Sequence, residues 1–251
     1  MKIPIGIIPG IVSDELKKDY AGTITQLAAL GYKAIEGTVT LNGDVAAGRA
    51  LLDSLGMRAI TIGVKKEALE TEFDKYMKDA DTLGVEHITV WWSECATKDA
   101  VLKDAELYNR IGPRIAARGY KLCYHNHDHE FKNAFDGVYA LDLLLDSTDP
   151  KALHSELDVA WVTYGGEDPV AYIKRRARRI PVIHLKDIAD INTRAKFTAV
   201  GTGIVKVKDV VDTAVACGVK WIVYEQDRPN NLTPMESVTA TMLNLKELGI
   251  A

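Results

Sequence analysis

The sequence predicts one (β/α)8 barrel that occupies the chain as a single domain, residues 1–251. Three observations support this fold. Eight apolar, β-branched segments recur along the chain, a helix-like stretch follows each of them, and several of these stretches end at a glycine just before the next segment. The segments begin 25 to 39 residues apart, which suits one strand–helix unit. Eight such units use the whole chain, as in barrels of this length.

The predicted strands are the segments 3–10, 32–38, 57–64, 85–92, 120–127, 153–162, 181–188 and 220–227. The main alternative is a doubly wound open sheet, which commonly carries a G-x-G-x-x-G motif at its first strand–helix turn. The glycine-containing segment GIIPG does not have that spacing. We therefore favour the barrel.

The helix boundaries are predicted from capping residues. Ser13 is expected to cap a helix that runs through Leu27 and Leu30. Pro169 and Pro234 suit the first turn of two later helices. A glycine without a Cβ atom can end a helix in the left-handed conformation, and we expect this of Gly31, Gly56, Gly84, Gly119 and Gly218.

The composition is that of an ordinary globular protein, with 47% hydrophobic and 26% charged residues. A net charge of −4, from 31 basic and 35 acidic side chains, argues against nucleic-acid binding. No apolar run approaches the roughly 20 residues that span a bilayer, so no membrane association is expected. Three widely spaced cysteines do not suggest a disulfide framework, and we expect a cytoplasmic protein.

Ionisable residues recur at the ends of the last four predicted strands, where the active sites of such barrels lie. Because side chains alternate along a strand, residues two apart share a face. We expect the six histidines and the paired carboxylates to be concentrated at strand ends. The pairs that share a face are His125 and His127, Glu156 and Asp158, His184 and Lys186, and Glu225 and Asp227.

Carboxylates that face the inside of a barrel are costly to bury unless they are paired or bind a cation. One residue from each of the last four strands could ligate a divalent metal: His125, Asp158, His184 and Glu225. Two imidazoles and two carboxylates suit Zn, Mn, Co or Fe better than Ca or Mg. We therefore expect one divalent ion, Mn, Co, Zn or Fe ahead of Mg.

Several segments together resemble the sugar phosphate isomerase/epimerase branch of the xylose isomerase-like barrel superfamily. These are YHNHDHEF, ELDVAWVTYGGEDPVAYI, IPVIHLKD, AVGTGIV and YEQD, and the similarity covers nearly the whole chain. The resemblance implies a (β/α)8 barrel with one divalent metal held by Glu, Asp, His and Glu from strands five to eight. The last three match Asp158, His184 and Glu225.

The first ligand departs from that pattern. Many relatives have Glu-Asn on the fifth strand, where this chain has His125 and Asn126. In those epimerases the fifth- and eighth-strand carboxylates also serve as the acid/base pair. His125 could replace the glutamate as ligand or as base, since imidazole titrates near neutrality. Glu130 is a second candidate for the missing carboxylate.

These residues predict an isomerase or epimerase that removes a proton next to the carbonyl of a keto-sugar and forms an enediolate. Glu225, His125, Lys186 and Glu130 are the catalytic candidates, although Lys186 could instead form an internal ion pair with Glu156. The sugar-binding candidates are Glu36, Trp92, His127, Glu156 and Trp161. The alternatives are a lyase on the same scaffold, either a dehydratase or a keto-glycoside-cleaving enzyme, and a non-catalytic sugar-binding barrel.

Two further motifs have a functional and a structural interpretation. The segment GTG at 201–203, with Lys206 nearby, could bind a phosphate, but an ordinary loop is favoured. The run KRRARR at 174–179 looks like a nucleic-acid patch, but a solvated helix face or a subunit contact fits the acidic chain better. The expected partner is a small-molecule sugar, and the chain could form a homo-oligomer.

Overall fold

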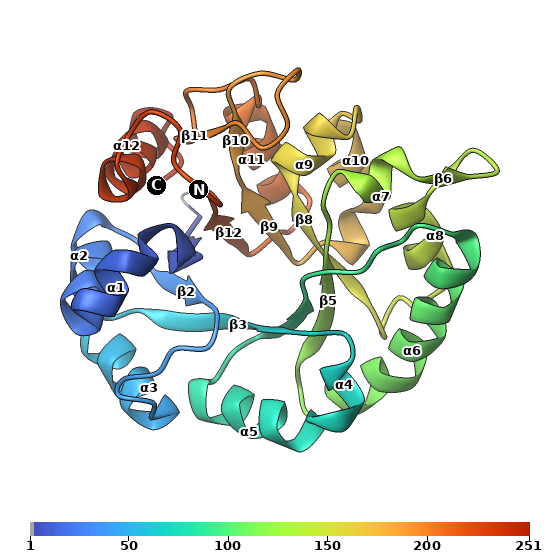
Figure 1. Ribbon diagram of the computed structural model, residues 1–251, viewed down its shortest axis with the longest axis horizontal. Coiled ribbons are helices and arrows are strands. Elements are labelled where there is room, and N and C mark those ends of the chain that lie inside the picture. Colours follow the sequence, from blue (N-terminus) through green and yellow to red (C-terminus); the bar gives the residue numbers. More distant parts are fainter. Residues whose placement is uncertain (1–2) are drawn as a thin grey trace.

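The computed structural model describes residues 3–251 and confirms the predicted barrel. Eight parallel strands close on themselves in the order β1-β12-β9-β8-β5-β4-β3-β2. Helices surround the strands (Figure 1). The barrel strands are β1 (Ile5–Ile7), β2 (Ala34–Glu36), β3 (Arg58–Val64), β4 (His87–Val90), β5 (Lys121–His125), β8 (His154–Asp158), β9 (Val182–Leu185) and β12 (Trp221–Tyr224).

The connections between strands contain the helices and two small hairpins. The hairpins are β6 (Ala134–Phe135) with β7 (Val138–Tyr139), and β10 (Asp187–Ile188) with β11 (Phe197–Thr198). The α-helices are α1 (Ser13–Lys18), α2 (Tyr20–Leu30), α3 (Val45–Ser54), α4 (Ala68–Thr71), α5 (Phe73–Leu83), α6 (Lys98–Ala116), α7 (His129–Lys132), α8 (Ala140–Asp146), α9 (Val159–Tyr164), α10 (Pro169–Arg176), α11 (Val207–Ala216) and α12 (Pro234–Glu247).

The predicted helix ends are confirmed, and one predicted start is wrong. All five of the glycines expected after helices have positive φ, and Pro169 and Pro234 begin α10 and α12. Ser13 lies inside α1 rather than capping it. The chain then breaks at Asp19, whose carboxylate accepts a hydrogen bond from Gly22 N and starts α2. Two helices therefore replace the single one expected from Ser13 to Leu30.

The sixth and seventh predicted strands are shorter than expected. Strand β8 ends at Asp158, because the Asp158 carboxylate caps helix α9 by accepting a hydrogen bond from Trp161 N at 2.9 Å. Trp161 therefore lies on a helix and not on a strand. Strand β9 ends at Leu185, and Asp187 and Ile188 turn aside into the β10–β11 hairpin. Both changes occur at the carboxyl end of the barrel, where the candidate site residues lie.

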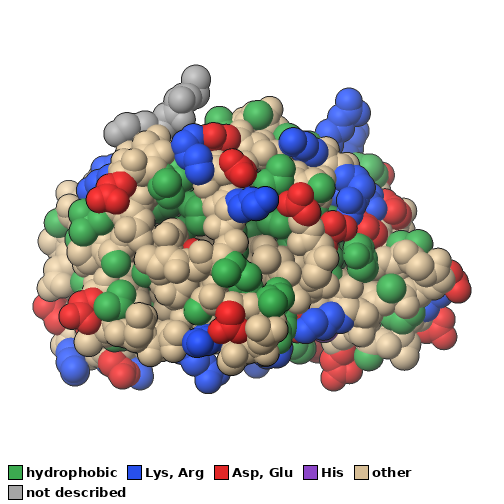
Figure 2. Space-filling view, turned by 90° about the horizontal axis from the view of Figure 1, so that it is seen from above, with side chains coloured by type: hydrophobic (Ala, Val, Ile, Leu, Met, Phe, Trp, Pro, Cys, Tyr) green, Lys and Arg blue, Asp and Glu red, His purple; other side chains and the backbone are tan. Residues whose placement is uncertain are grey.

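Two apolar clusters form the core. The larger cluster contains apolar side chains of the helices and of the barrel strands. The smaller cluster comes from strands β2, β3, β9 and β12. Acidic and basic side chains are interspersed over the face drawn in Figure 2. Within residues 3–251, no helix has the length and apolar character needed to cross a membrane.

Candidate metal and active site

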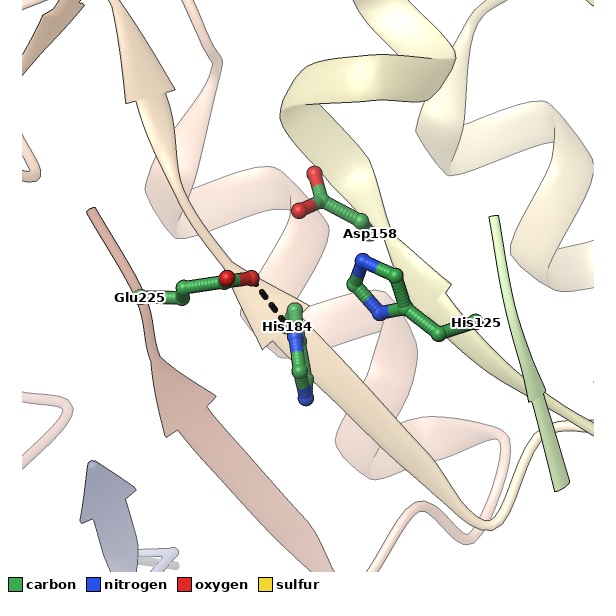
Figure 3. A group of neighbouring side chains, drawn as sticks. All are labelled: His125, Asp158, His184 and Glu225. Atoms are coloured by element: carbon green, nitrogen blue, oxygen red, sulfur yellow. Dashed lines mark hydrogen bonds and ion pairs between the residues drawn. The ribbon is translucent and has the colours of Figure 1, made fainter. Parts of the chain in front are cut away.

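Four side chains from successive strands converge at the carboxyl end of the barrel. One ligand atom each of His125, Asp158, His184 and Glu225 lies within 4.8 Å of all the others. Figure 3 shows the four side chains pointing toward one another. The first three are buried, and the Glu225 side chain is 15% exposed. This is the set of residues that the sequence predicts as metal ligands, and its donor atoms are close enough to share one ion.

Two further carboxylates lie behind the imidazoles. His184 Nε2 lies 3.2 Å from Glu156 Oε1 and 3.1 Å from Glu36 Oε1, while its Nδ1 lies 2.9 Å from Glu225 Oε2. Glu156 Oε1 is also 3.6 Å from His125 Nδ1. Thr89 donates a hydrogen bond to the other Glu156 oxygen at 2.9 Å. Glu156 thus contacts both imidazoles of the group, and its expected role in binding sugar stays a prediction.

The charges of this cluster shift its pKa values in opposite directions. Burial raises the pKa of Glu36 to about 7, and the neighbouring Glu156 carboxylate adds to the rise. Burial also favours the neutral form of Glu156, but His184 and His125 outweigh it and lower its pKa. Burial lowers the pKa of His184, but Glu36 and Glu156 raise it well above the ordinary value. Glu156 and His184 are therefore an ion pair at neutral pH, with Glu36 partly protonated.

Lys186 is fully buried among carboxylates. Its Nζ atom lies 3.1 Å from Asp158 Oδ2, 3.0 Å from Glu225 Oε2 and 3.0 Å from Asp227 Oδ2. An internal ion pair was an expected alternative, but the partners are these carboxylates rather than Glu156. Although burial opposes the charge, Asp158 and Glu225 raise the pKa of Lys186 far above its usual range. Lys186 remains an ammonium group and cannot act as a base at neutral pH.

Asp158 is held in place by the segment that follows β5. Asn126 accepts a hydrogen bond from Asp158 N at 3.0 Å and donates one to Asp158 O at 3.3 Å. The Asp158 Oδ1 atom accepts the hydrogen bond that caps α9, which leaves Oδ2 facing Lys186. Burial raises the pKa of Asp158 despite the opposing charge of Lys186. The backbone therefore fixes the orientation of this carboxylate.

Three of the sugar-binding candidates, His127, Trp92 and Trp161, have aromatic rings, and none of them lies within a barrel strand. His127 lies two residues beyond the end of β5, so strand alternation does not place it, yet its ring lies 5.0 Å from His125. Trp92 lies 4.8 Å from the His127 ring and is 42% exposed. Trp161, on α9, is buried at 5.7 Å from His127 and at 5.4 Å from Lys186 Nζ. The His127 ring thus lies beside His125, and Trp92 and Trp161 pack against His127.

Glu130 is not part of the four-residue group. Its carboxylate accepts hydrogen bonds from Tyr124 Oη at 2.5 Å and from His127 N at 2.8 Å. It belongs to a separate cluster with Cys95 and His129. His129 Nε2 in turn contacts the carbonyl oxygen of Ser93 at 2.7 Å. The structure therefore brings His125, and not Glu130, to the place of the fifth-strand carboxylate.

The GTG segment is a structural loop, as favoured. The backbone N–H groups of Gly201 and Gly203 donate to Asp187 Oδ2 at 3.0 and 2.9 Å, and Val205 N donates to its Oδ1 atom at 3.0 Å. A Cβ atom at Gly203 would lie 2.3 Å from Asp187 Oδ1. The Asp187 carboxylate thus occupies the position in which a phosphate could have been bound.

The basic run is also structural for the most part. Arg175 pairs with Glu167 at 3.1 Å, and Arg176 pairs with Asp142 at 2.8 Å. Arg179 is buried and donates to backbone carbonyls, including Leu145 O at 2.8 Å. These arginines are neutralised or used within the fold, which supports the favoured interpretation of a helix face over a nucleic-acid patch.

Asn126 and Thr89 were not singled out as site residues from the sequence. The sequence feature that could have pointed to Asn126 is its position between two histidines. For Thr89 it is the spacing of two residues from Trp91 on a predicted strand. Neither signal is specific, because Asn and Thr are common at strand ends. Their roles depend on bonds to Asp158 and Glu156, which lie 32 and 67 residues further along the chain.

Known proteins share both the sequence pattern and the fold. Residues 24–248 match the family described as xylose isomerase-like TIM barrel. An inosose dehydratase of Geobacillus kaustophilus is 29% identical over 206 residues, covering 72% of this chain and 65% of that protein. A second, from Geobacillus thermodenitrificans, is aligned over 48% of its length. The chain thus spans about half to two thirds of these relatives.

Solved structures agree with the family assignment. A sugar phosphate isomerase/epimerase from Parabacteroides distasonis has a TM-score of 0.84 at 22% identity, with 98% of each chain covered. The IolI protein, solved with a zinc atom, has a TM-score of 0.75 at 15% identity, again with 98% of each chain covered. At these identities the likeness shows a common fold. With the family match over residues 24–248, the chain belongs to the xylose isomerase-like TIM barrel family.

Proposed function

We propose that this protein is a divalent-metal-dependent lyase acting on a cyclic keto-polyol or keto-sugar. It removes a proton next to the carbonyl and then expels the oxygen substituent on the following carbon. The observation that carries the proposal is the convergence of His125, Asp158, His184 and Glu225 within 4.8 Å. Relatives named inosose dehydratase support elimination over isomerisation.

The residues of the group fit a bound metal. Asp158 and Glu225 supply carboxylate oxygens, and His125 and His184 supply imidazole nitrogens. Such a set suits Zn, Mn, Co or Fe, and zinc in the IolI neighbour supports a metal here. A bound divalent ion would polarise the substrate carbonyl and stabilise the negative charge that develops on its oxygen. Glu156, behind both imidazoles, would orient them toward the ion.

Glu225 is the proposed base. Its Oε2 atom contacts Lys186 and His184, and it is the most exposed member of the group. A carboxylate can keep these contacts through one oxygen and accept the substrate proton with the other. The electrons of the broken C–H bond form the C=C bond as the neighbouring C–O bond breaks. Lys186, which stays charged, would stabilise the oxyanion.

Glu225 is also the proposed acid, because each imidazole would use one nitrogen for the metal and has its other nitrogen near a carboxylate. The departing oxygen must take up a proton to leave as water or as an alcohol, and Glu225 can return to it the proton taken from carbon. The fifth-strand carboxylate that would complete a two-carboxylate epimerase is replaced by the His125 imidazole, which favours elimination. An isomerase or epimerase would share the first step and return the proton to the substrate instead.

The proposal is tested by NMR in D2O with the metal-loaded protein and a panel of inososes, keto-glycosides and ketohexoses. We expect loss of water or alcohol from one class of compound, and no turnover after metal removal or with Glu225→Gln. Deuterium entering a recovered or isomerised sugar without elimination would overturn the lyase in favour of the isomerase or epimerase. No exchange with any compound would leave a sugar-binding barrel. Leu243→Ala, on the exposed face of α12, is the matched control.

A further inference from the structure

A pocket opens at the carboxyl ends of β3 and β4, near the candidate active site. It has a volume of about 300 Å³ and is lined by Lys65, Lys66, Glu67, Trp91, Trp92 and Glu94, among others. We call it the tandem-tryptophan pocket. None of its residues belongs to the four-residue group, so the reaction proposed above leaves it unexplained. A cavity of this size accommodates one small ring.

Two adjacent tryptophans are exposed in this pocket. Trp91 is 48% exposed and Trp92 is 42% exposed. Exposed indole rings lose the free energy that burial would provide, and neighbouring exposed aromatics commonly mark a binding surface. Gly63 lies beside Trp91, since a Cβ atom there would be in ordinary contact with the indole ring at 3.6 Å. The broad apolar faces of such rings pack against the C–H faces of sugars.

The loop that presents the tryptophans is held rigidly by other elements. Ser93 accepts a hydrogen bond from Lys66 Nζ at 3.0 Å and its carbonyl oxygen contacts His129, while the carbonyl of Cys95 accepts a hydrogen bond from Asn133 at 3.0 Å. Cys95 has φ of +48°, a conformation that costs free energy in a residue other than glycine. The fold therefore maintains a strained loop, and a preformed surface binds a ligand with little loss of entropy.

The tandem-tryptophan pocket adjoins the candidate active site through two aromatic contacts. Trp92 lies 4.8 Å from His127, and His127 lies 5.0 Å from His125, measured between ring centroids. Trp92, which lines the pocket, and His127 thus form a chain of ring contacts that leads from the pocket to the candidate metal ligand His125. We infer that a molecule of two linked rings extends along this chain from one place to the other.

The charges around the pocket favour a neutral ligand. Lys65 and Lys66 are balanced by Glu67 and Glu94, and Lys66 already pairs with Asp104 at 2.8 Å. An anionic group such as a phosphate would meet two glutamates. The hydroxyl groups of a sugar can donate to these glutamates and accept from the lysines. Aromatic faces with a rim of charged hydrogen-bonding groups therefore suit a pyranose ring.

We propose that the tandem-tryptophan pocket binds a second sugar ring, joined by a glycosidic bond to the ring at the four-residue group. The inference rests on the proposed lyase function and narrows its substrate to glycosides, in which the leaving group is a sugar. Trp91 and Trp92 then determine specificity. The alcohol released by the elimination is the sugar in this pocket, and its glycosidic oxygen takes up the proton that the acid supplies.

The test compares binding of the disaccharides cellobiose, maltose and trehalose with that of glucose to the metal-loaded protein, by calorimetry and tryptophan fluorescence. We expect at least one disaccharide to bind about tenfold or more tightly than glucose and to protect tryptophan from acrylamide quenching. The double variant Trp91→Ala/Trp92→Ala should lose this preference. Trp91→Phe/Trp92→Phe should keep most of it, and Leu243→Ala should keep all of it.

Three results would overturn the proposal. They are equal affinity for glucose and every disaccharide, a preference that survives in the double alanine variant, and protection from acrylamide that depends on protein concentration without sugar. The last would indicate that the tryptophans contact a second copy of the chain. Failure of the lyase function appears separately, as absent metal binding or absent exchange in D2O, and does not alter the disaccharide preference.

Discussion

Two histidines of nearly equal burial lie at opposite ends of the barrel, and their pKa values shift in opposite directions. His184, on β9, is 1% exposed, and His87, the first residue of β4, is 2% exposed. The pKa of His184 is raised well above the ordinary value, because nearby carboxylates outweigh the effect of burial. Burial lowers the pKa of His87 to about 4. The same residue type is thus an ionic partner at one end and a core residue at the other.

The difference lies in the partners of the imidazole. Both ring nitrogens of His184 face carboxylate oxygens, whereas His87 Nδ1 has no hydrogen-bond partner within the described residues. His154, the first residue of β8, resembles His87, and burial lowers its pKa to about 4. The six histidines are therefore not all concentrated at the candidate site, as the sequence suggested. A histidine indicates a site here only where carboxylates from neighbouring strands reach it.

The largest expected effect is the loss of metal binding when a ligand at the carboxyl end is removed. We expect His184→Ala and Asp158→Asn each to weaken metal affinity by at least about 100-fold, because a ligand bond is lost. The matched variant His154→Gln, at the other end of the barrel, should bind metal as the unchanged protein does. Calorimetric titration with Zn and Mn measures this. If the unchanged protein and all three variants bind metal with equal affinity, the carboxyl end of the barrel does not hold the metal site.

A smaller effect is expected from the carboxylate behind the imidazoles. Glu156→Gln keeps the shape of the side chain but loses the charge that faces His125 and His184, so we expect a roughly 10- to 100-fold loss of metal affinity. Thr89→Val removes the hydrogen bond to Glu156 and should cost less. If Glu156 instead contacts sugar, as first predicted, its variant would bind metal normally and lose only sugar affinity.

The positions of the predicted strand ends were sufficient to bring the four-residue group together. Alternation places Glu156 and Asp158 on one face of β8, whereas Lys186 and Glu225 lie one residue beyond the ends of β9 and β12. Parallel strands bring all these carboxyl ends to one side of the barrel. These are consequences of local geometry, so they follow from the sequence. The glycines that end helices follow in the same way, because their left-handed conformation is a local requirement.

Other parts of the fold and of the candidate site depend on contacts that local sequence patterns do not reveal. Trp161 was expected to lie on a strand, but the Asp158 carboxylate ends β8 and begins α9. Glu130 was close in sequence to His125, yet Tyr124 and the backbone of His127 hold its carboxylate in another cluster. In each case one or two hydrogen bonds decide the direction of the chain or side chain. Such bonds compete on small free-energy differences, which residue types and spacing do not specify.

The third prediction uses pH to compare the two ends. His184 is protonated in the metal-free protein near neutrality, so a metal must displace a proton to bind it. Metal affinity should therefore rise with pH, by up to about tenfold per unit of pH for one displaced proton. Calorimetry in buffers of different ionisation enthalpy measures the proton released. A pH-independent affinity would show that His184 is neutral or is not a ligand.

The smallest expected effect is on stability and comes from His87. Its pKa of about 4 in the folded protein is below the ordinary 6.5, so protonation favours the unfolded chain. The unfolding free energy is therefore highest above pH 6.5 and decreases as the pH falls toward 4. For this residue alone the decrease is about 1 kcal/mol between pH 7.5 and 6. Urea unfolding at both pH values should show it, and His87→Gln should reduce the pH dependence by about this amount. If His87→Gln leaves the dependence unchanged, His87 is not one of the groups that make the barrel sensitive to acid.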